Sequence, residues 1–244
     1  MPKNPVPTNW NPSFDDKPTS DVPRIKFSRN FSEKYLDKKS SILEVGCGIG
    51  SYTRFIDRKG CYAIDLDINA IRIAKKYCVY PDFIVASALD LPFKNDTFES
   101  VCMWGVFEEI PRGGENEIVV GIQKILKTDG VFLLSVYTDH LISKLFDPAF
   151  IFRGVRHYDQ ESFLNLIRDS GMIVKEYTVR GGVNTIISNF LVYFYKHFLK
   201  KKEGSFKKYF DNKSTKEINL NENGLIYLYV AASKKMPNNS KSEM

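Results

Sequence analysis

The chain has 244 residues, 43% of them hydrophobic and 26% charged, which is the balance of a globular protein with one sizeable core. Its four cysteines show no CxxC pair and no histidine at ligand spacing, so neither a zinc site nor a disulfide framework is indicated, and no metal is expected. Eight lysines against two acids between residues 190 and 216 account for the whole net charge of +6. The basic pI of 9.0 therefore reflects one segment and is weak evidence for a nucleic-acid partner.

The N-terminal residues 1–21 are rich in proline and asparagine and contain no apolar run preceded by basic residues, which argues against a signal peptide. No window reaches the roughly 18 apolar residues that span a bilayer. With reduced cysteines, these features indicate a soluble, cytoplasmic protein. We expect a tail over residues 1–23, one domain over 24–236 and a second tail over 237–244.

From Ser41 onward, β-rich apolar runs alternate with helical patterns, which favours a parallel sheet with crossover helices. The predicted strands are 42–45, 62–66, 83–86, 100–104, 131–137, 173–179 and 225–232. The predicted helices are 52–57, 69–77, 115–126 and 160–170, with glycines after several of them as stop signals. The fold class is therefore α/β: a doubly wound, mostly parallel seven-stranded sheet of Rossmann-like type, with a helical insertion before the last strand.

The first predicted strand leads into a glycine-rich turn, in which Gly46, Gly48 and Gly50 stand at every second position after Glu44. Glycines there permit positive φ and a close approach of the backbone to a ligand, and the helix that follows offers free N–H groups. A dinucleotide fingerprint would need its third glycine where Ser51 stands. The turn therefore predicts a ligand site of a different type.

Asp65 stands near the end of the second predicted strand, about twenty residues after the glycines, where a carboxylate can accept hydrogen bonds from both ribose hydroxyls. The alternative is that Asp65 caps the next helix. Asp67 is better placed for that, because it stands directly before the helical pattern. We therefore interpret Asp65 as a ribose ligand.

A third motif is formed by residues 86–93, ASALDLPF, and residues 95–101, NDTFESV. With the ExGxGxG turn and Asp65, it resembles the motif series of class I S-adenosylmethionine-dependent methyltransferases, over roughly residues 41–136. Two departures are visible. Ser87 replaces the acid that usually meets the adenine amine, and Glu99 replaces the usual aspartate before the fourth strand.

The resemblance implies that S-adenosylmethionine is the cofactor, with its methionine part over the glycine turn and its adenine against Leu66 and the loop at Ser87. The residues expected to contact it are Glu44, Gly46, Gly48, Gly50, Asp65, Leu66, Ser87, Ala88, Leu89 and Trp104.

The segment that begins at Trp104 is where the family places the methyl acceptor. It lacks the Asn/Asp-Pro-Pro-aromatic tetrad of the enzymes that methylate amino groups of bases and glutamine. It also lacks the Pro-Cys pair of the cytosine C5 enzymes, so Cys102 is interpreted as a buried strand residue. What remains resembles the branch that acts on small molecules and lipids.

A base is needed only if the acceptor loses a proton during transfer, and Glu108, Glu109 and His157 are the candidates, because the family places their segments at the acceptor pocket. An alternative stays open for each. The two glutamates could form a solvated helix start, where acids are favoured by the helix dipole, and His157 could be a polar residue before a helix.

The insertion at residues 183–216 places Ile186, Phe190, Phe194 and Phe198 on one helix face, followed by a run of lysines. We favour a lid over the acceptor pocket. The other interpretations are a homodimer contact, a membrane-surface segment over residues 186–213, and an ordinary packed helix with a solvated lysine tail.

The expected function is transfer of a methyl group to an oxygen, nitrogen or carbon of a small-molecule or lipid-like acceptor. An aminopropyl transferase would need an acidic cluster for a polyamine, and none stands out. A non-catalytic cofactor-binding or scaffold protein remains an alternative. So does a nucleic-acid methyltransferase that uses the basic insertion, although the missing tetrad makes nucleic acid the less favoured acceptor.

Overall fold

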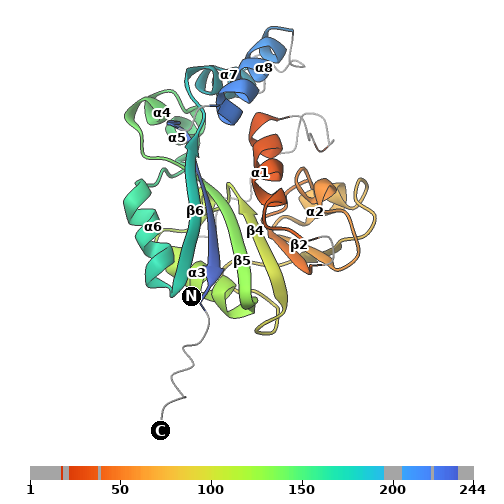
Figure 1. The fold of residues 1–244 in the computed structure, drawn as a ribbon. Helices are drawn as coiled ribbons and strands as arrows, with labels where there is room; N and C mark the ends of the chain where they lie inside the picture. The colour runs from red at the N-terminus through yellow and green to blue at the C-terminus, as the bar shows by residue number, and fades with distance from the viewer. Residues whose placement is uncertain (1–17, 19–21, 38–39, 195–204, 221–222, 236–244) are drawn as a thin grey trace.

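The computed structural model describes residues 18, 22–37, 40–194, 205–220 and 223–235 (Figure 1). A seven-stranded sheet in the order β3-β2-β1-β4-β5-β7-β6 forms its centre. The strands are β1 Ile42–Val45, β2 Cys61–Asp65, β3 Asp82–Val85, β4 Phe98–Trp104, β5 Leu126–Tyr137, β6 Met172–Arg180 and β7 Tyr227–Lys234. β7 runs antiparallel to both of its neighbours, and the other pairs are parallel. The predicted fold class is confirmed, because all seven predicted strands are present and a helical insertion precedes the last one.

Helices cover both faces of the sheet. They are α1 Pro23–Glu33, α2 Ile68–Ala74, α3 Glu115–Ile125, α4 Leu141–Leu145, α5 Pro148–Arg153, α6 Gln160–Asp169, α7 Val183–Phe194 and α8 Ser205–Leu220, with 3₁₀ turns η1 Thr53–Phe55 and η2 Phe107–Glu109.

The core has two main layers because successive side chains of a strand point to opposite faces. In β7, Leu228 and Val230 join the layer beneath α3 and α6, whereas Tyr227 and Tyr229 join the layer beneath α1. Nearly all of β7 is buried on both faces, as expected of a strand inside a covered sheet.

Helix α1 lies in a region from which the sequence predicted no element. Its Phe27 and Phe31 are buried, and both rings lie against Tyr229 of β7. The helix begins one residue before the predicted domain boundary at 24. It therefore belongs to the core, while residues 1–17, 19–21 and 237–244 of the expected tails lie outside the described residues.

Several predicted boundaries differ from the structure. The predicted helix 52–57 is only the 3₁₀ turn η1, and β5 begins at Leu126 rather than 131, because Leu126 pairs with Phe98 before the turn at Asp129. The short helices α4 and α5 were not predicted. Among the described residues, no helix is both long and apolar enough to cross a membrane.

The described residues of the insertion belong to two helices, α7 and α8. Ile186 of α7 and Ile218 of α8 are buried in the layer beneath α1, so both helices belong to the core at one end. Phe190 and Phe194, on the predicted apolar face of α7, are 45% and 37% exposed. Phe198 and the lysines at 196 and 200–202 lie outside the described residues.

Candidate functional site

The glycine turn after β1 contains three glycines with positive φ, each in a different environment. A Cβ at Gly46 would stand 2.3 Å from Cγ2 of Val106, and one at Gly50 would stand 3.0 Å from Cβ of Ala74. Both positions therefore need glycine for packing. A Cβ at Gly48 would meet no heavy atom within 4 Å, so the backbone there faces open space that a ligand can approach.

Asp65 at the end of β2 is half-buried and faces this turn. Its Oδ2 accepts the backbone N–H of Gly48 at 2.8 Å, and its Oδ1 accepts the N–H of Asp67 at 2.9 Å. Asp67 caps α2 by accepting the N–H of Asn69. The helix cap is therefore Asp67, as the sequence indicated, and the Asp65 carboxylate lies beside the open side of the turn.

Two other predicted segments border the same space. Leu66 is 54% exposed directly after Asp65, although it is apolar. The loop at Ser87 starts beside β2, because Ala86 donates its N–H to the carbonyl oxygen of Asp65. Within that loop, Oγ of Ser87 accepts the N–H of Leu89 at 3.1 Å. Ala88 lies between them, and all three of these loop residues are half-buried.

Glu44 lies in β1, two residues before the glycine turn begins. Its side chain is buried, and its Oε2 accepts the hydroxyl of Thr53 in η1 at 2.6 Å. Burial raises the pKa of Glu44 to about 8, although the hydrogen bond from Thr53 opposes the shift. The hydrogen bond joins the 3₁₀ turn η1 to β1.

Glu99, the second departure from the family pattern, lies at the opposite end of the sheet from the turn. Its carboxylate accepts the N–H of Ser41 at 2.6 Å and forms an ion pair with Lys127. Burial would raise its pKa, but these partners outweigh burial and lower the pKa to about 2. Glu99 therefore connects β1 and β5 and does not face the site.

At the end of β4, Trp104 is buried against Tyr52 and Tyr229. Its Nε1 has no hydrogen-bond partner in the described part of the chain. A Cβ at Gly105 would stand 2.1 Å from Nη1 of Arg24, so the guanidinium of α1 lies over the end of this strand. Sequence reasoning missed Arg24, because α1 itself carried too weak a signal.

Glu108 is buried rather than solvated, so a solvated helix start is the wrong interpretation for this residue. Its Oε1 accepts the N–H of Tyr137 at 2.9 Å, and its buried Oε2 has no hydrogen-bond partner among the described groups. Burial raises the pKa of Glu108 to about 7, while Arg24 opposes the shift. The neighbouring Glu109 is exposed, as expected of an acid at a solvated helix start.

Both ring nitrogens of His157 are engaged. Nδ1 lies 2.9 Å from the carbonyl oxygen of Thr138, and Nε2 lies 2.9 Å from Oδ2 of Asp147. The ring also stacks on Tyr137, with centroids 5.3 Å apart. These contacts hold the loop after β5 and leave neither nitrogen directed at the glycine turn.

Arg24 and Glu108 belong to a polar group with Tyr137 and Tyr227 at the ends of β5 and β7. The two tyrosine rings are 5.1 Å apart, and Asn189 of α7 donates to the Tyr227 hydroxyl at 2.8 Å. Burial would lower the pKa of Arg24, but the two tyrosines and Glu108 favour the charged form and raise it above its ordinary value. A fixed positive charge therefore lies beside Glu108.

Two other expectations concern cysteines and metals. All four cysteines are buried and free, and Cys102 lies in the middle of the sheet, where burial raises the pKa of its thiol. Such a thiol is a poor nucleophile, which agrees with its interpretation as a strand residue. The described residues contain no cluster of three potential metal ligands.

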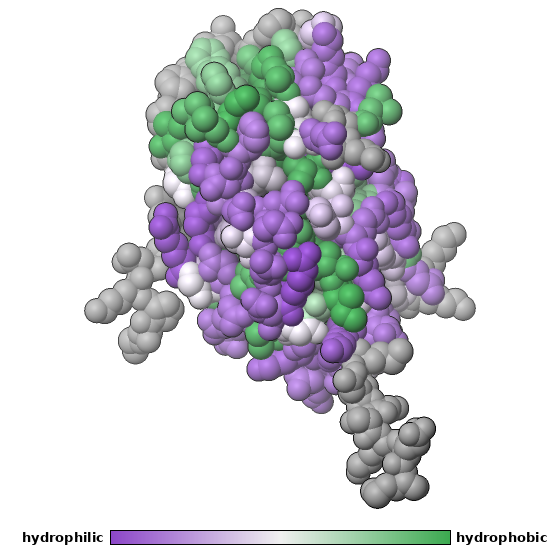
Figure 2. Space-filling model, turned by 60° about the vertical axis from the view of Figure 1, so that its left-hand side comes forward, coloured by the Kyte–Doolittle hydropathy of each residue, from purple (hydrophilic) through white to green (hydrophobic). Residues whose placement is uncertain are grey.

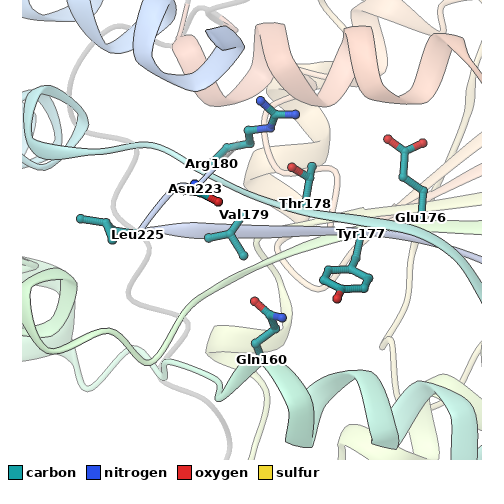
Figure 3. A pocket seen from close by; sticks show the side chains of 9 residues that line it. Gln160, Glu176, Tyr177, Thr178, Val179, Arg180, Asn223 and Leu225 are labelled. Carbon is teal, nitrogen blue, oxygen red and sulfur yellow. The ribbon is translucent and has the colours of Figure 1, made fainter. Parts of the chain in front are cut away.

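A pocket of about 630 Å³ lies at the other edge of the sheet, along β6 (Figure 3). Tyr177 and Val179 point to the same side of the strand as Gln160, whereas Arg180 points toward α1. None of the predicted cofactor residues lines this pocket. Because β4, β5 and β7 separate β6 from β1, it is distinct from the space at the glycine turn.

Comparison with known proteins agrees with the motif series. Residues 42–130 match the family model described as "Methyltransferase domain". An uncharacterized protein of Methanocaldococcus jannaschii is 26% identical over 137 residues, which are 54% of this chain and 58% of that protein. The chain thus spans less than two thirds of that relative's length.

Solved structures show the same fold at low sequence identity. An S-adenosylmethionine-dependent methyltransferase from Methanosarcina mazei has a TM-score of 0.59 at 16% identity, covering 85% of this chain and 98% of that one. Geranyl diphosphate C-methyltransferase from Streptomyces coelicolor, solved with S-adenosylhomocysteine, has a TM-score of 0.61 at 11% identity, with coverage of 86% and 77%. The [4+2]-cyclase SpnF has a TM-score of 0.64 at 17% identity, with coverage of 87% and 81%.

Proposed function

We propose that this chain, which matches a methyltransferase-domain model over residues 42–130, transfers a methyl group from S-adenosylmethionine to a small-molecule or lipid-like acceptor. The observation that carries the proposal is the open space over Gly48, bordered by the Asp65 carboxylate. A fold alone does not determine a reaction, so the proposal rests on this site.

The residues around the space suit the parts of that cofactor. The turn from Gly46 to Gly50 would lie under its methionine part, and Leu66 offers an exposed apolar surface for the adenine. A carboxylate has about four acceptor positions, so Asp65 can hold Gly48 and Asp67 and still accept from ribose hydroxyls. The bound cofactor would supply an electrophilic methyl carbon attached to a sulfonium.

The acceptor would lie at the carboxyl end of β4, where Glu108 is the candidate proton acceptor. Its Oε2 is the unpartnered oxygen, and a pKa of about 7 lets it take up a proton near neutral pH. Arg24 next to it keeps the ionised form accessible despite burial. Because both His157 nitrogens have partners, we assign His157 to holding the loop after β5.

Glu109 is exposed on the same turn, so it is the control residue for Glu108.

A second function, cofactor binding without methyl transfer, has one observation in its favour. The guanidinium of Arg24 lies over Gly105, so α1 covers the strand end where an acceptor would meet the methyl group. A protein that binds the cofactor without transferring its methyl group would have such a covered end.

Calorimetry on the purified chain tests the cofactor step, and radiolabelled methyl transfer tests the reaction. We expect S-adenosylmethionine and S-adenosylhomocysteine to bind and NAD not to bind. Binding of NAD alone would refute the proposal. Binding of the cofactor without methyl transfer to any of a broad panel of amine, hydroxyl and lipid acceptors would favour the non-catalytic function.

A further inference from the structure

Large apolar side chains are exposed together at one end of the molecule (Figure 2). They come from α4, the residue after it, α5 and α7, and we call them the apolar patch. The patch consists of Leu141, Leu145, Phe146, Ile151, Phe190 and Phe194. Leu141 is 70% exposed and Phe146 is 56% exposed, and a clustered set of this kind marks an interaction surface rather than ordinary surface variation.

The patch is continuous because its helices pack on one another: α4 contacts α5, and α5 contacts α7. α4 and α5 follow β5, and α7 follows β6. Since β5 and β6 are both antiparallel to β7, they run in the same direction, and their carboxyl ends lie at the same edge of the sheet as the glycine turn. The patch therefore lies at the functional end of the domain.

Positive charge adjoins the patch on α8, which packs along α7. Lys208, Lys213 and Lys216 are all exposed on this helix. The two acids of α8 are directed to α7 instead, because Asp211 accepts from Ser188 and Glu217 accepts the backbone N–H of Thr185. The outer face of α8 is therefore basic.

An exposed tyrosine lies among the lysines of α8, and the sequence next to this helix is also rich in lysine. Tyr209 is 52% exposed, and the ammonium of Lys213 lies 4.7 Å from the centroid of its ring. By sequence alone, the segment 195–204 contains four lysines and one glutamate. Apolar side chains bordered by lysines and tyrosine are the composition of a segment that lies in the interface of an anionic bilayer.

We propose that the apolar patch and the lysines of α8 dock this protein on the surface of an anionic phospholipid bilayer. A second copy of the chain fits less well, because a two-fold contact places the same surface of each copy together and would bring the two sets of lysines close. Nucleic acid would use the lysines but not the aliphatic tips of Leu141 and Leu145.

Docking in this way does not depend on methyl transfer. If the proposed function also holds, the acceptor end of the site faces the bilayer. An amphiphilic acceptor could then reach the site from the membrane.

Sedimentation of the full chain with vesicles tests the proposal. We expect binding to vesicles of phosphatidylcholine mixed with phosphatidylglycerol, little binding to phosphatidylcholine alone, and weakening with added salt. Leu141→Gln combined with Leu145→Gln should reduce the partition coefficient about tenfold or more, since each loses buried apolar area. Replacing Lys208, Lys213 and Lys216 with glutamine should reduce it by a similar factor of about ten or more.

Matched controls are available away from the patch. Val79 is 80% exposed after α2, Lys75 and Lys76 are exposed directly after α2, and Lys124 is exposed on α3. Val79→Gln, and the three lysines changed to glutamine together, should leave vesicle binding unchanged. All these side chains are exposed, so circular dichroism should report native folding for every variant.

Three results would overturn the proposal. The first is no binding to anionic vesicles, or equal binding to neutral ones. The second is a concentration-dependent dimer on gel filtration that Leu141→Gln with Leu145→Gln abolishes, which would assign the patch to a second copy. The third is loss of vesicle binding in the control variants to the same extent.

Discussion

The carboxylate of Asp65 is hydrogen-bonded to the backbone N–H of Gly48, with Oδ2 and N 2.8 Å apart. This bond joins the end of β2 to the turn that follows β1, across two strands that pair in parallel. The same residue that we assign to the ribose therefore also fixes the turn that would lie under the methionine part. In the proposed site, this one side chain would couple cofactor binding to the geometry of the turn.

Changing Asp65 to asparagine should weaken S-adenosylhomocysteine binding by roughly 1–3 kcal/mol, because an amide replaces acceptor positions for the ribose hydroxyls with donors. Calorimetry measures the loss. Asp67→Asn is the matched control, because asparagine is an equally good helix cap and should leave the affinity unchanged. A loss of affinity in Asp67→Asn with none in Asp65→Asn would contradict the prediction and assign the ribose to Asp67.

Alanine at Gly48 and at Gly50 should have different effects, although both glycines have positive φ. At Gly48 a methyl group would enter open space, so we expect a stability loss of about 1 kcal/mol from the left-handed backbone and a clear loss of cofactor affinity. At Gly50 it would also press on Ala74, so the stability loss should be larger. Thermal unfolding without ligand and calorimetry separate the two. Unchanged affinity in folded Gly48→Ala would mean that no ligand occupies that space.

Local signals in the sequence were sufficient for the sheet and the turn. The strand ending at Val45, the glycines after it and Asp65 at the next strand end are short-range patterns that the structure preserves. The capping role of Asp67 could also be predicted, because it depends only on the position of Asp67 before an apolar helical run.

Features that depend on distant contacts could not be predicted. α1 has no side-chain cap at Val22, and the only helical pattern in its sequence is Phe27 and Phe31 at four-residue spacing. Those rings are buried against Tyr229 of β7, which lies at the other end of the sequence, so local propensity could not show it. Burial of Glu108 has a similar cause, since acids at a helix start are usually solvated, and here the N–H of Tyr137 holds the carboxylate inside.

The pH dependence of the reaction tests Glu108. If its Oε2 accepts a proton from the acceptor, kcat/KM should rise with pH through about 7 and then level off, because the ionised form is the active one. Glu108→Gln should lower kcat/KM by roughly 10²–10⁴-fold and remove the rise.

Exposed Glu109 supplies the control, since Glu109→Gln should keep both the rate and the profile of the parent protein. A carboxyl titration near 7 in the NMR spectrum, absent from Glu108→Gln, would identify the group independently of the acceptor. A profile that stays unchanged in Glu108→Gln would exclude this residue as the proton acceptor.

Stability should depend on pH through Glu44, whose pKa is raised to about 8 in the folded chain from an ordinary value of 4.5. Below 4.5 both states are protonated, and the contribution is fully present. Between 4.5 and 8 only the folded state keeps the proton, so the free energy of unfolding should fall as pH rises.

Glu44→Gln keeps an oxygen that can accept from Thr53 but cannot ionise, so it should flatten this slope, with a difference on the order of 5 kcal/mol across the range. Urea unfolding at a series of pH values measures it. Glu99→Gln is the contrasting variant. The lowered pKa of Glu99 stabilises the fold above 4.5, and this contribution is lost as pH falls toward 2, so the substitution should change the slope of stability with pH only in acid conditions. If Glu44→Gln kept the full slope between pH 5 and 8, the Glu44 carboxyl would have to be ionised in the folded protein, and the buried hydrogen bond to Thr53 would involve a charged acceptor.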